Sequence, residues 1–320
     1  MPRHMPRFAK SLTDLTFAGF LFCIASAAAA ATPRVETTIK PVHSLVSGVM
    51  AGVGTPNLLI QGTGSPHAYA LRPSEARRLQ EADIVFWVGP VLETFLTRPL
   101  AALARDARII ALIDSPGLTR LELRDAGTWT GASGSDHDHD HDHDHKPGGS
   151  DPHIWLDPAN AAAMTKAIAT ALAAADPAQA ARYHANARDQ LARISRMQAN
   201  LAARLTLLRQ RPYIVFHDAY QYFEKRFGLH PAGAVTIAPD RAPGARRLVA
   251  LRAHIRATGA RCIFVEPQFT PQTATIIAEG TGARIAVLDP LGAALTPDAD
   301  AYFTLMEKLG SNLAACLAAP

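Results

Sequence analysis

Short apolar strands alternate with helical segments in two separate blocks of this 320-residue chain. In the first block the pattern predicts strands at 34–39, 57–61, 83–88 and 108–113 and helices at 44–52, 73–81 and 91–104. In the second block it predicts strands at 213–216, 234–237, 261–265 and 284–288 and helices at 218–227, 243–258, 271–279 and 299–317. Continuous apolar strands that alternate with helices are typical of parallel sheets covered on both faces. We therefore expect two α/β lobes.

A long helical stretch lies between the two blocks. Residues 158–174 are rich in alanine, and Asp176 followed by Pro177 is typical of a helix start. No proline or glycine follows up to Leu208, so a helix of about 45 Å could bridge the lobes. The expected organisation is an N-terminal lobe at 32–175, a linker helix at 176–210 and a C-terminal lobe at 211–320, with a ligand site in the cleft between the lobes.

The first 31 residues have the pattern of a cleavable signal peptide. Arg3, Arg7 and Lys10 precede an apolar run that ends in alanines, which is the order of a secretory signal. A membrane anchor is the alternative, although the run is short for a membrane span. The whole chain carries a formal charge of only +4, and this small, scattered excess does not favour binding to nucleic acid.

Two cysteines remain after the expected cleavage, which would remove Cys23. In an exported protein Cys262 and Cys316 could form one disulfide bond, and two buried thiols are the alternative. The distance between them in the sequence excludes a Cys-x-x-Cys metal or redox site.

Residues 114–150 contain little periodic apolar pattern and end in a run of alternating aspartate and histidine. The histidines of this run are His137, His139, His141, His143 and His145. A segment without core-forming residues is expected to be a flexible loop. Alternating carboxylates and imidazoles would bind divalent metals loosely, and a solvated loop without a metal role is the alternative.

Outside this run, potential metal ligands occur at the ends of predicted strands. His67, His217 and Asp289 each come shortly after a strand, and ligands of parallel sheets bind at the carboxyl ends of strands. His153 lies in a turn that could reach the same cleft, and His43 is a weaker candidate. Three imidazoles and one carboxylate suit Zn²⁺. Each histidine alone could instead be a helix cap or a structural loop residue.

Several longer stretches can be compared with a known family. They are SPHAYALRPS at 65–74, ADIVFWVGP at 82–90, HIWLDP at 153–158, FHDAYQYFE at 216–224, FVEPQF at 264–269 and LDPLG at 288–292. With these stretches the chain resembles the zinc-specific, ZnuA-like solute-binding proteins of bacterial ABC uptake systems. The resemblance extends in order across essentially the whole mature chain.

This resemblance implies that the protein is not an enzyme but captures zinc in the periplasm. His67, His153 and His217 would be the primary ligands of the transported ion in the cleft, and the Asp/His run would match the family's metal-associated loop. The family's disulfide would join Cys262 to Cys316. The partner would be an inner-membrane ABC permease with its cytoplasmic ATPase, and the binding protein is expected to be a monomer.

The fourth ligand and the metal are less directly implied. Some zinc members are similar in having a glutamate before the first histidine, but this chain has Pro66 there. Asp289 or a water molecule remains for that position, and we favour Asp289. Relatives that carry manganese or iron typically replace the third histidine with a carboxylate, whereas His217 is retained here. The long helix should limit hinge opening, so we expect rearrangement of the loop around His153 to matter more.

Other functions are compatible with the same residues. A secreted zinc hydrolase would need a general base, for which Glu266 and Asp218 are candidates, but no His-Glu-x-x-His motif occurs. A binding protein for manganese or another divalent metal, a metal-dependent adhesin and a periplasmic zinc buffer are further alternatives.

Overall fold

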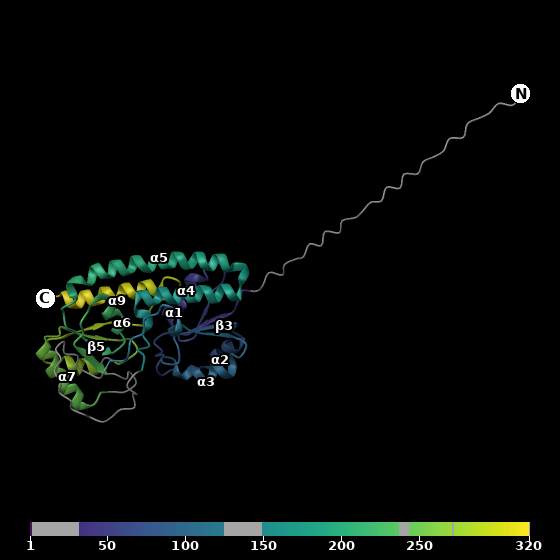
Figure 1. The fold of residues 1–320 in the computed structure, drawn as a ribbon. Helices are drawn as coiled ribbons and strands as arrows, with labels where there is room; N and C mark the ends of the chain where they lie inside the picture. The colour runs from purple at the N-terminus through teal and green to yellow at the C-terminus, as the bar shows by residue number, and fades with distance from the viewer. Residues whose placement is uncertain (2–31, 125–148, 237–242, 271, 320) are drawn as a thin grey trace. The chain divides into compact units, whose positions relative to one another are not determined.

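The computed structural model describes residue 1 and residues 32–124, 149–236, 243–270 and 272–319. The predicted signal peptide and the Asp/His run lie outside these residues. Residues 32–319 contain two parallel sheets of four strands, as the sequence predicts (Figure 1). The N-terminal sheet has the order β2-β1-β3-β4, with β1 at Val35–Thr37, β2 at Asn57–Leu58, β3 at Ile84–Trp87 and β4 at Arg108–Ala111.

The C-terminal sheet repeats this arrangement. Its order is β6-β5-β7-β8, with β5 at Ile214–His217, β6 at Gly233–Thr236, β7 at Cys262–Val265 and β8 at Arg284–Val287. Alternate residues of β3, β5 and β7 enter different apolar clusters. Phe264, for example, packs in the largest core, whereas Val265 packs in a second cluster on the other face. Burial on both faces explains why these strands read as continuous apolar runs.

Helices cover both sheets. The N-terminal lobe has α1 at Lys40–Val49, α2 at Pro73–Glu81 and α3 at Thr97–Leu103; the C-terminal lobe has α6 at Gln221–Phe227, α7 at Ala245–Thr258, α8 at Gln272–Ala278 and α9 at Ala301–Ala318. Within the described residues, no helix is both long enough and apolar enough to cross a membrane.

Two long helices join the lobes. These are α4 at Pro158–Ala175 and α5 at Ala180–Leu205, which lie side by side (Figure 1). The helix α5 packs against α1 of the N-terminal lobe and against α9 of the C-terminal lobe, so a linker helix that bridges both lobes is confirmed. It begins at Ala180, four residues after the expected start at Asp176, because Pro177–Gln179 forms a 3₁₀ turn. The exact lobe boundaries stay a prediction.

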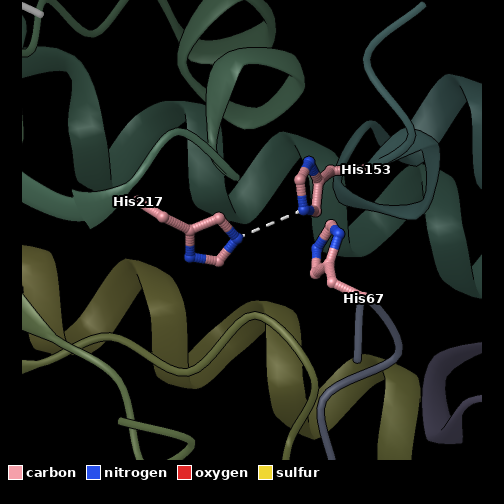
Figure 2. Close-up of side chains that lie close together, drawn as sticks. All are labelled: His67, His153 and His217. Carbon is pink, nitrogen blue, oxygen red and sulfur yellow. Dashed lines mark hydrogen bonds between the residues drawn. The ribbon is translucent and has the colours of Figure 1, made fainter. Parts of the chain in front are cut away.

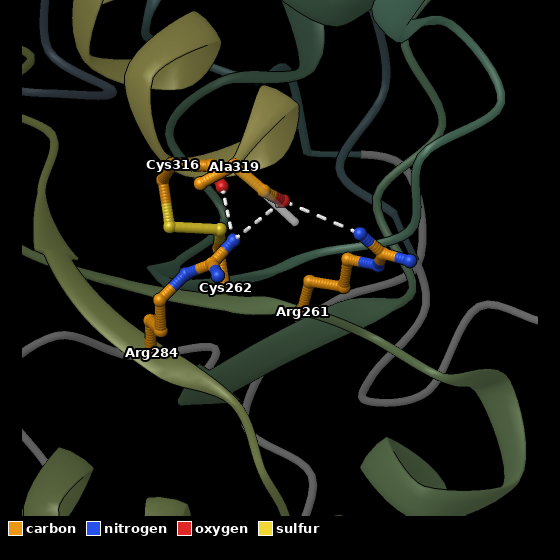
Figure 3. Close-up of a disulfide and its surroundings, with 5 residues drawn as sticks. All are labelled: Arg261, Cys262, Arg284, Cys316 and Ala319. Atoms are coloured by element: carbon orange, nitrogen blue, oxygen red, sulfur yellow. Dashed lines mark hydrogen bonds between the residues drawn. A yellow bond between two sulfur atoms is a disulfide. The ribbon is translucent and has the colours of Figure 1, made fainter.

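The C-terminal end of α9 is fastened to the sheet of its lobe. Cys262 at the start of β7 forms a disulfide with Cys316 (Figure 3). Beside it, Arg284 donates hydrogen bonds to the carbonyl oxygens of Cys316 and Ala319, and Arg261 donates to that of Ala319. The disulfide therefore ties the sheet to the helix on which α5 rests.

Candidate metal centre

The strand β5 ends on His217 and places it at the carboxyl edge of the C-terminal sheet. Glu266 follows β7, the neighbour of β5, and so reaches the same edge. Nδ1 of His217 lies 2.6 Å from Oε1 of Glu266, and both side chains are buried. Because a carboxylate accepts the Nδ1 hydrogen, the Nε2 atom keeps the lone pair that a metal needs.

His153 is held in the same way by a different segment. Oδ1 of Asp151 lies 3.0 Å from the backbone nitrogen of His153 and 2.8 Å from its Nδ1. The following 3₁₀ helix, Ile154–Leu156, is buried, and Nε1 of Trp155 donates to the carbonyl oxygen of Pro290 at 2.8 Å. These contacts fix the His153 segment against the C-terminal lobe, with Nε2 directed towards His217.

His67 approaches from the N-terminal lobe in a partly buried turn after β2. Its ring centroid lies 5.4 Å from that of His153 and 5.7 Å from that of His217 (Figure 2). Each of the three rings offers one nitrogen, and these nitrogens all lie within 4.8 Å of one another. Among the described residues this is the one group of three or more His, Cys, Asp or Glu side chains that could hold a metal ion.

The spacing of the buried pair matches a tetrahedral metal. Nε2 of His153 and Nε2 of His217 are 3.3 Å apart. Two nitrogens bound to a tetrahedral zinc ion at about 2.0–2.1 Å would be roughly 3.3–3.4 Å apart. With both Nδ1 atoms donating to carboxylates, the two Nε2 lone pairs face each other, and only a proton or a metal cation between them removes their repulsion.

Burial and neighbouring charges make the two rings unequal as bases. Burial, followed by the charge of His217, lowers the pKa of His153 well below its usual value. Burial also lowers the pKa of His217, but the charge and hydrogen bond of Glu266 outweigh this effect and raise it. Burial raises the pKa of Asp151 to about 7. A proton between the rings is therefore held mainly by His217.

The space among the histidines is small. The cavity has a volume of about 10 Å³ and is lined on its apolar side by Trp155, Phe269 and Pro290. A cavity of this size has room for about one water molecule. Phe269 lies edge-on to His217, with 5.8 Å between the ring centroids. A divalent ion must therefore lose most of its water shell to reach the three nitrogens.

The structure does not bring Asp289 into the histidine cluster. Its Oδ1 accepts hydrogen bonds from Nε2 of Gln268 at 3.2 Å and from the backbone nitrogens of Leu291 and Gly292, both at 3.0 Å. Its Oδ2 accepts from the backbone nitrogen of Ala293 at 2.6 Å. These bonds order the turn after β8, and the assignment of Asp289 as fourth ligand stays a prediction.

The remaining candidates have other contacts. His43 is buried within α1, where Nε2 lies 3.1 Å from the carbonyl oxygen of Pro56. Asp218 forms a close ion pair with Arg124, so it is not available as the general base of a hydrolase. The five histidines of the Asp/His run lie outside the described residues.

Sequence reasoning missed the role of two carboxylates. The sequence offers Glu266 only as a candidate hydrolase base, and it gives no role to Asp151. The available signals were the position of Glu266 at the end of a strand next to β5 and the Asp-x-His spacing of Asp151 and His153. Neither signal identifies the partner histidine without the fold.

Comparisons of sequence and of structure both match this chain to zinc-uptake proteins. The family model "Zinc-uptake complex component A periplasmic" matches residues 35–316. The high-affinity zinc uptake system protein ZnuA of Brucella abortus (strain 2308) is 42% identical over 317 residues, covering 92% of this chain and 95% of the relative. ZnuA of Paracoccus denitrificans (strain Pd 1222) is 40% identical, with 96% and 98% covered. A crystal structure of ZnuA aligns with a TM-score of 0.75 at 25% identity, covering 89% of this chain and 99% of that one.

Proposed function

The chain belongs to the ZnuA family of periplasmic zinc-uptake components, and from this premise we propose that His67, His153 and His217 bind the transported ion. The protein is the high-affinity zinc-binding component of an ABC uptake system and is not an enzyme. Zinc is its cargo, so the site must both hold the ion and release it.

The observation that carries the proposal is the arrangement of the buried histidine pair. Their Nε2 atoms are 3.3 Å apart, while each Nδ1 is held by a carboxylate. Such carboxylate partners fix the ring orientation and make the imidazole a better ligand. Three neutral imidazoles favour zinc over manganese, which prefers oxygen ligands. The surrounding carboxylates offset the charge of the ion without contacting it.

We place a water molecule in the fourth position of the coordination sphere. Asp289 and water were the two candidates, and the four hydrogen bonds that Asp289 already accepts support the second. Coordination by Asp289 would require these backbone bonds to be exchanged.

The proposed transport step is capture followed by delivery. As a component of a zinc-uptake complex the protein has a permease partner. We propose that the zinc-loaded monomer docks on this permease in the inner membrane and that a cytoplasmic ATPase drives the transfer. The packing of α5 against helices of both lobes supports small movements around the site rather than wide opening.

We propose further that the Asp/His run is an auxiliary metal collector. His137, His139, His141, His143 and His145 alternate with carboxylates, and this composition binds divalent ions in many geometries. Deletion of residues 136–145 should remove weak additional zinc equivalents and leave the tight equivalent unchanged in a calorimetric titration.

The first test is competition calorimetry on metal-free protein with Zn²⁺ and Mn²⁺, using wild type and His217→Ala. The proposal predicts one tight zinc site, weak manganese binding and a large loss of zinc affinity in the variant. Loss of all binding on deletion of 136–145, with no effect of His217→Ala, would contradict it. His184→Ala is the matched control, because this histidine lies on α5 outside the cluster.

A further inference from the structure

The three-histidine site gives no role to the polar residue Gln268. It lines the cavity two residues after Glu266, the partner of His217. Its amide oxygen, Oε1, is buried, and no described residue provides a hydrogen-bond donor to it. A buried acceptor without a partner is costly, and such a group in a native fold calls for a functional explanation.

The orientation of this amide is set by its neighbour. Nε2 of Gln268 lies 3.2 Å from Oδ1 of Asp289. Oδ1 of Asp289 accepts hydrogen bonds, so the NH₂ group of Gln268 must face it and the amide oxygen must face away from it. Asp289 is itself fixed by the backbone nitrogens of the turn after β8. The amide oxygen is therefore held in one orientation, on a residue that lines the cavity.

We propose that Gln268 is a positioning residue that accepts a hydrogen bond from the water molecule in the fourth coordination position of zinc. This inference rests on the proposed histidine site. An amide oxygen is an uncommon zinc ligand, whereas calcium takes it readily. A zinc-bound water is polarised and is a strong hydrogen-bond donor, so it satisfies the buried oxygen and is held against the metal.

The proposal also gives Asp289 a function that does not involve the metal directly. Its carboxylate anchors the NH₂ group of Gln268 and thereby directs the oxygen to the water. The effect of Asp289 on zinc binding then passes through Gln268. A residue that coordinates zinc itself would act independently of Gln268, and this difference can be measured.

The first experiment compares Gln268→Leu with the matched control Gln221→Leu. Gln221 also has a buried amide oxygen without a described donor, but it lies at the start of α6 and does not line the cavity. Competition with a fluorescent zinc chelator should show about a tenfold loss of zinc affinity in Gln268→Leu. This is the smaller loss expected when a residue that supports a metal ligand without binding the metal is replaced. Gln221→Leu should bind zinc as wild type does.

The second readout is fluoride binding to the Co²⁺-loaded proteins, followed by visible absorption. Fluoride is similar to water in size but has no hydrogen to donate, so the amide oxygen should disfavour it. Gln268→Leu should therefore bind fluoride about tenfold more tightly than wild type while binding zinc more weakly. Loss of packing alone does not predict opposite changes. Unchanged fluoride affinity in Gln268→Leu would overturn the proposal.

A double-mutant cycle tests the role of Asp289. If Asp289 acts through Gln268, Asp289→Ala should weaken zinc binding about tenfold, and adding Gln268→Leu should cause little further loss. Additive losses would instead support direct coordination by Asp289 and overturn the proposal. The variant His217→Ala separates the two hypotheses. If it binds zinc as wild type does, the proposed histidine site is wrong. If it binds zinc weakly while Gln268→Leu binds zinc as wild type does, only the inference about Gln268 is rejected.

Discussion

The two lobes supply their histidines in different ways. His217 ends a strand that is buried on both faces, and Glu266 fixes its ring. His67 lies in a partly buried turn of the N-terminal lobe. His153 belongs in this respect with His217, since Asp151 and Trp155 hold its segment. The carboxylate partners hold the rings of the buried pair in place, and the difference in burial predicts that this pair contributes more to zinc affinity than the partly buried His67.

The segment around His153 is fixed to the C-terminal lobe by several described contacts. The sequence predicts instead that this segment rearranges. The carbonyl oxygen of Asp151 accepts a hydrogen bond from Tyr222 at 3.1 Å, and the hydroxyl of Tyr222 accepts one from the backbone nitrogen of Leu121 at 2.9 Å. Rearrangement around His153 stays a prediction.

The largest expected effect concerns the covalent constraint in the C-terminal lobe. Replacing both Cys262 and Cys316 with alanine should lower the free energy of unfolding by about 4 kcal/mol, because the disulfide closes a segment with a sequence separation of 54. Guanidinium melts of metal-free protein measure this loss, and wild type in reducing buffer is the control. Zinc affinity should change less than about threefold. A parallel collapse of zinc affinity would show that the buried pair depends on the disulfide.

The next largest effect is the loss of zinc affinity when a buried ligand or the partly exposed ligand is removed. His217→Ala should weaken zinc binding by roughly 100- to 1,000-fold, if about 10–16 kcal/mol of binding free energy is shared by four ligands. His67→Ala should lose about tenfold less, because a partly exposed ligand gains less from low-dielectric surroundings than a buried one. Competition titrations with a zinc chelator give both values. A greater loss in His67→Ala would contradict the expectation that the two buried ligands contribute more than the partly exposed one.

The carboxylates behind the buried pair should have a smaller effect. Glu266→Gln and Asp151→Asn keep the size of each side chain but remove its negative charge, so each should weaken zinc binding by about 10- to 100-fold. The contribution of His67 to zinc affinity should change less in both variants than that of the buried pair. The matched control is Glu93→Gln, a buried carboxylate bonded to Thr38 and to the backbone nitrogen of Gly89 outside the cluster. Equal losses in all three variants would mean that the effect is one of general stability.

The sequence predicted the architecture well because its signals are local. Strand length, apolar runs and the absence of helix breakers after Pro177 depend only on neighbouring residues, and the two sheets and α5 appear where expected. The pairing of Cys262 with Cys316 is also confirmed. Small differences arise where backbone geometry decides: the predicted helix 91–104 is a 3₁₀ turn at Thr94–Leu96 followed by α3.

The site was predictable only in part because its remaining contacts are between distant segments. The three histidines could be found from strand ends and family resemblance, and the structure brings them together. Which oxygen supports which ring depends on strand order, since β5 and β7 are neighbours although 49 residues separate His217 from Glu266. The contacts of Gln268 and Asp289 depend on the path of the turn after β8, which no local pattern encodes.

The smallest expected effect is the pH dependence of zinc binding. It also distinguishes the buried pair, His153 and His217, from His67. Glu266 holds the pKa of His217 above its usual value, and burial raises that of Asp151 to about 7. Below these values a proton occupies the group in metal-free protein and competes with zinc, so affinity should fall by about tenfold for each pH unit and proton released. Above them the affinity should become independent of pH.

Calorimetry in two buffers of different ionisation enthalpy counts the protons released on zinc binding. Wild type should release at least one proton below the raised pKa of His217. His153 should release none in this range, because its pKa lies well below the usual value. In His217→Ala the part of this dependence that comes from His217 should be lost and the part from Asp151 kept, whereas His67→Ala should keep both. Equal loss in both variants would show that the competing proton is shared by all three rings and that the buried pair is not a separate unit.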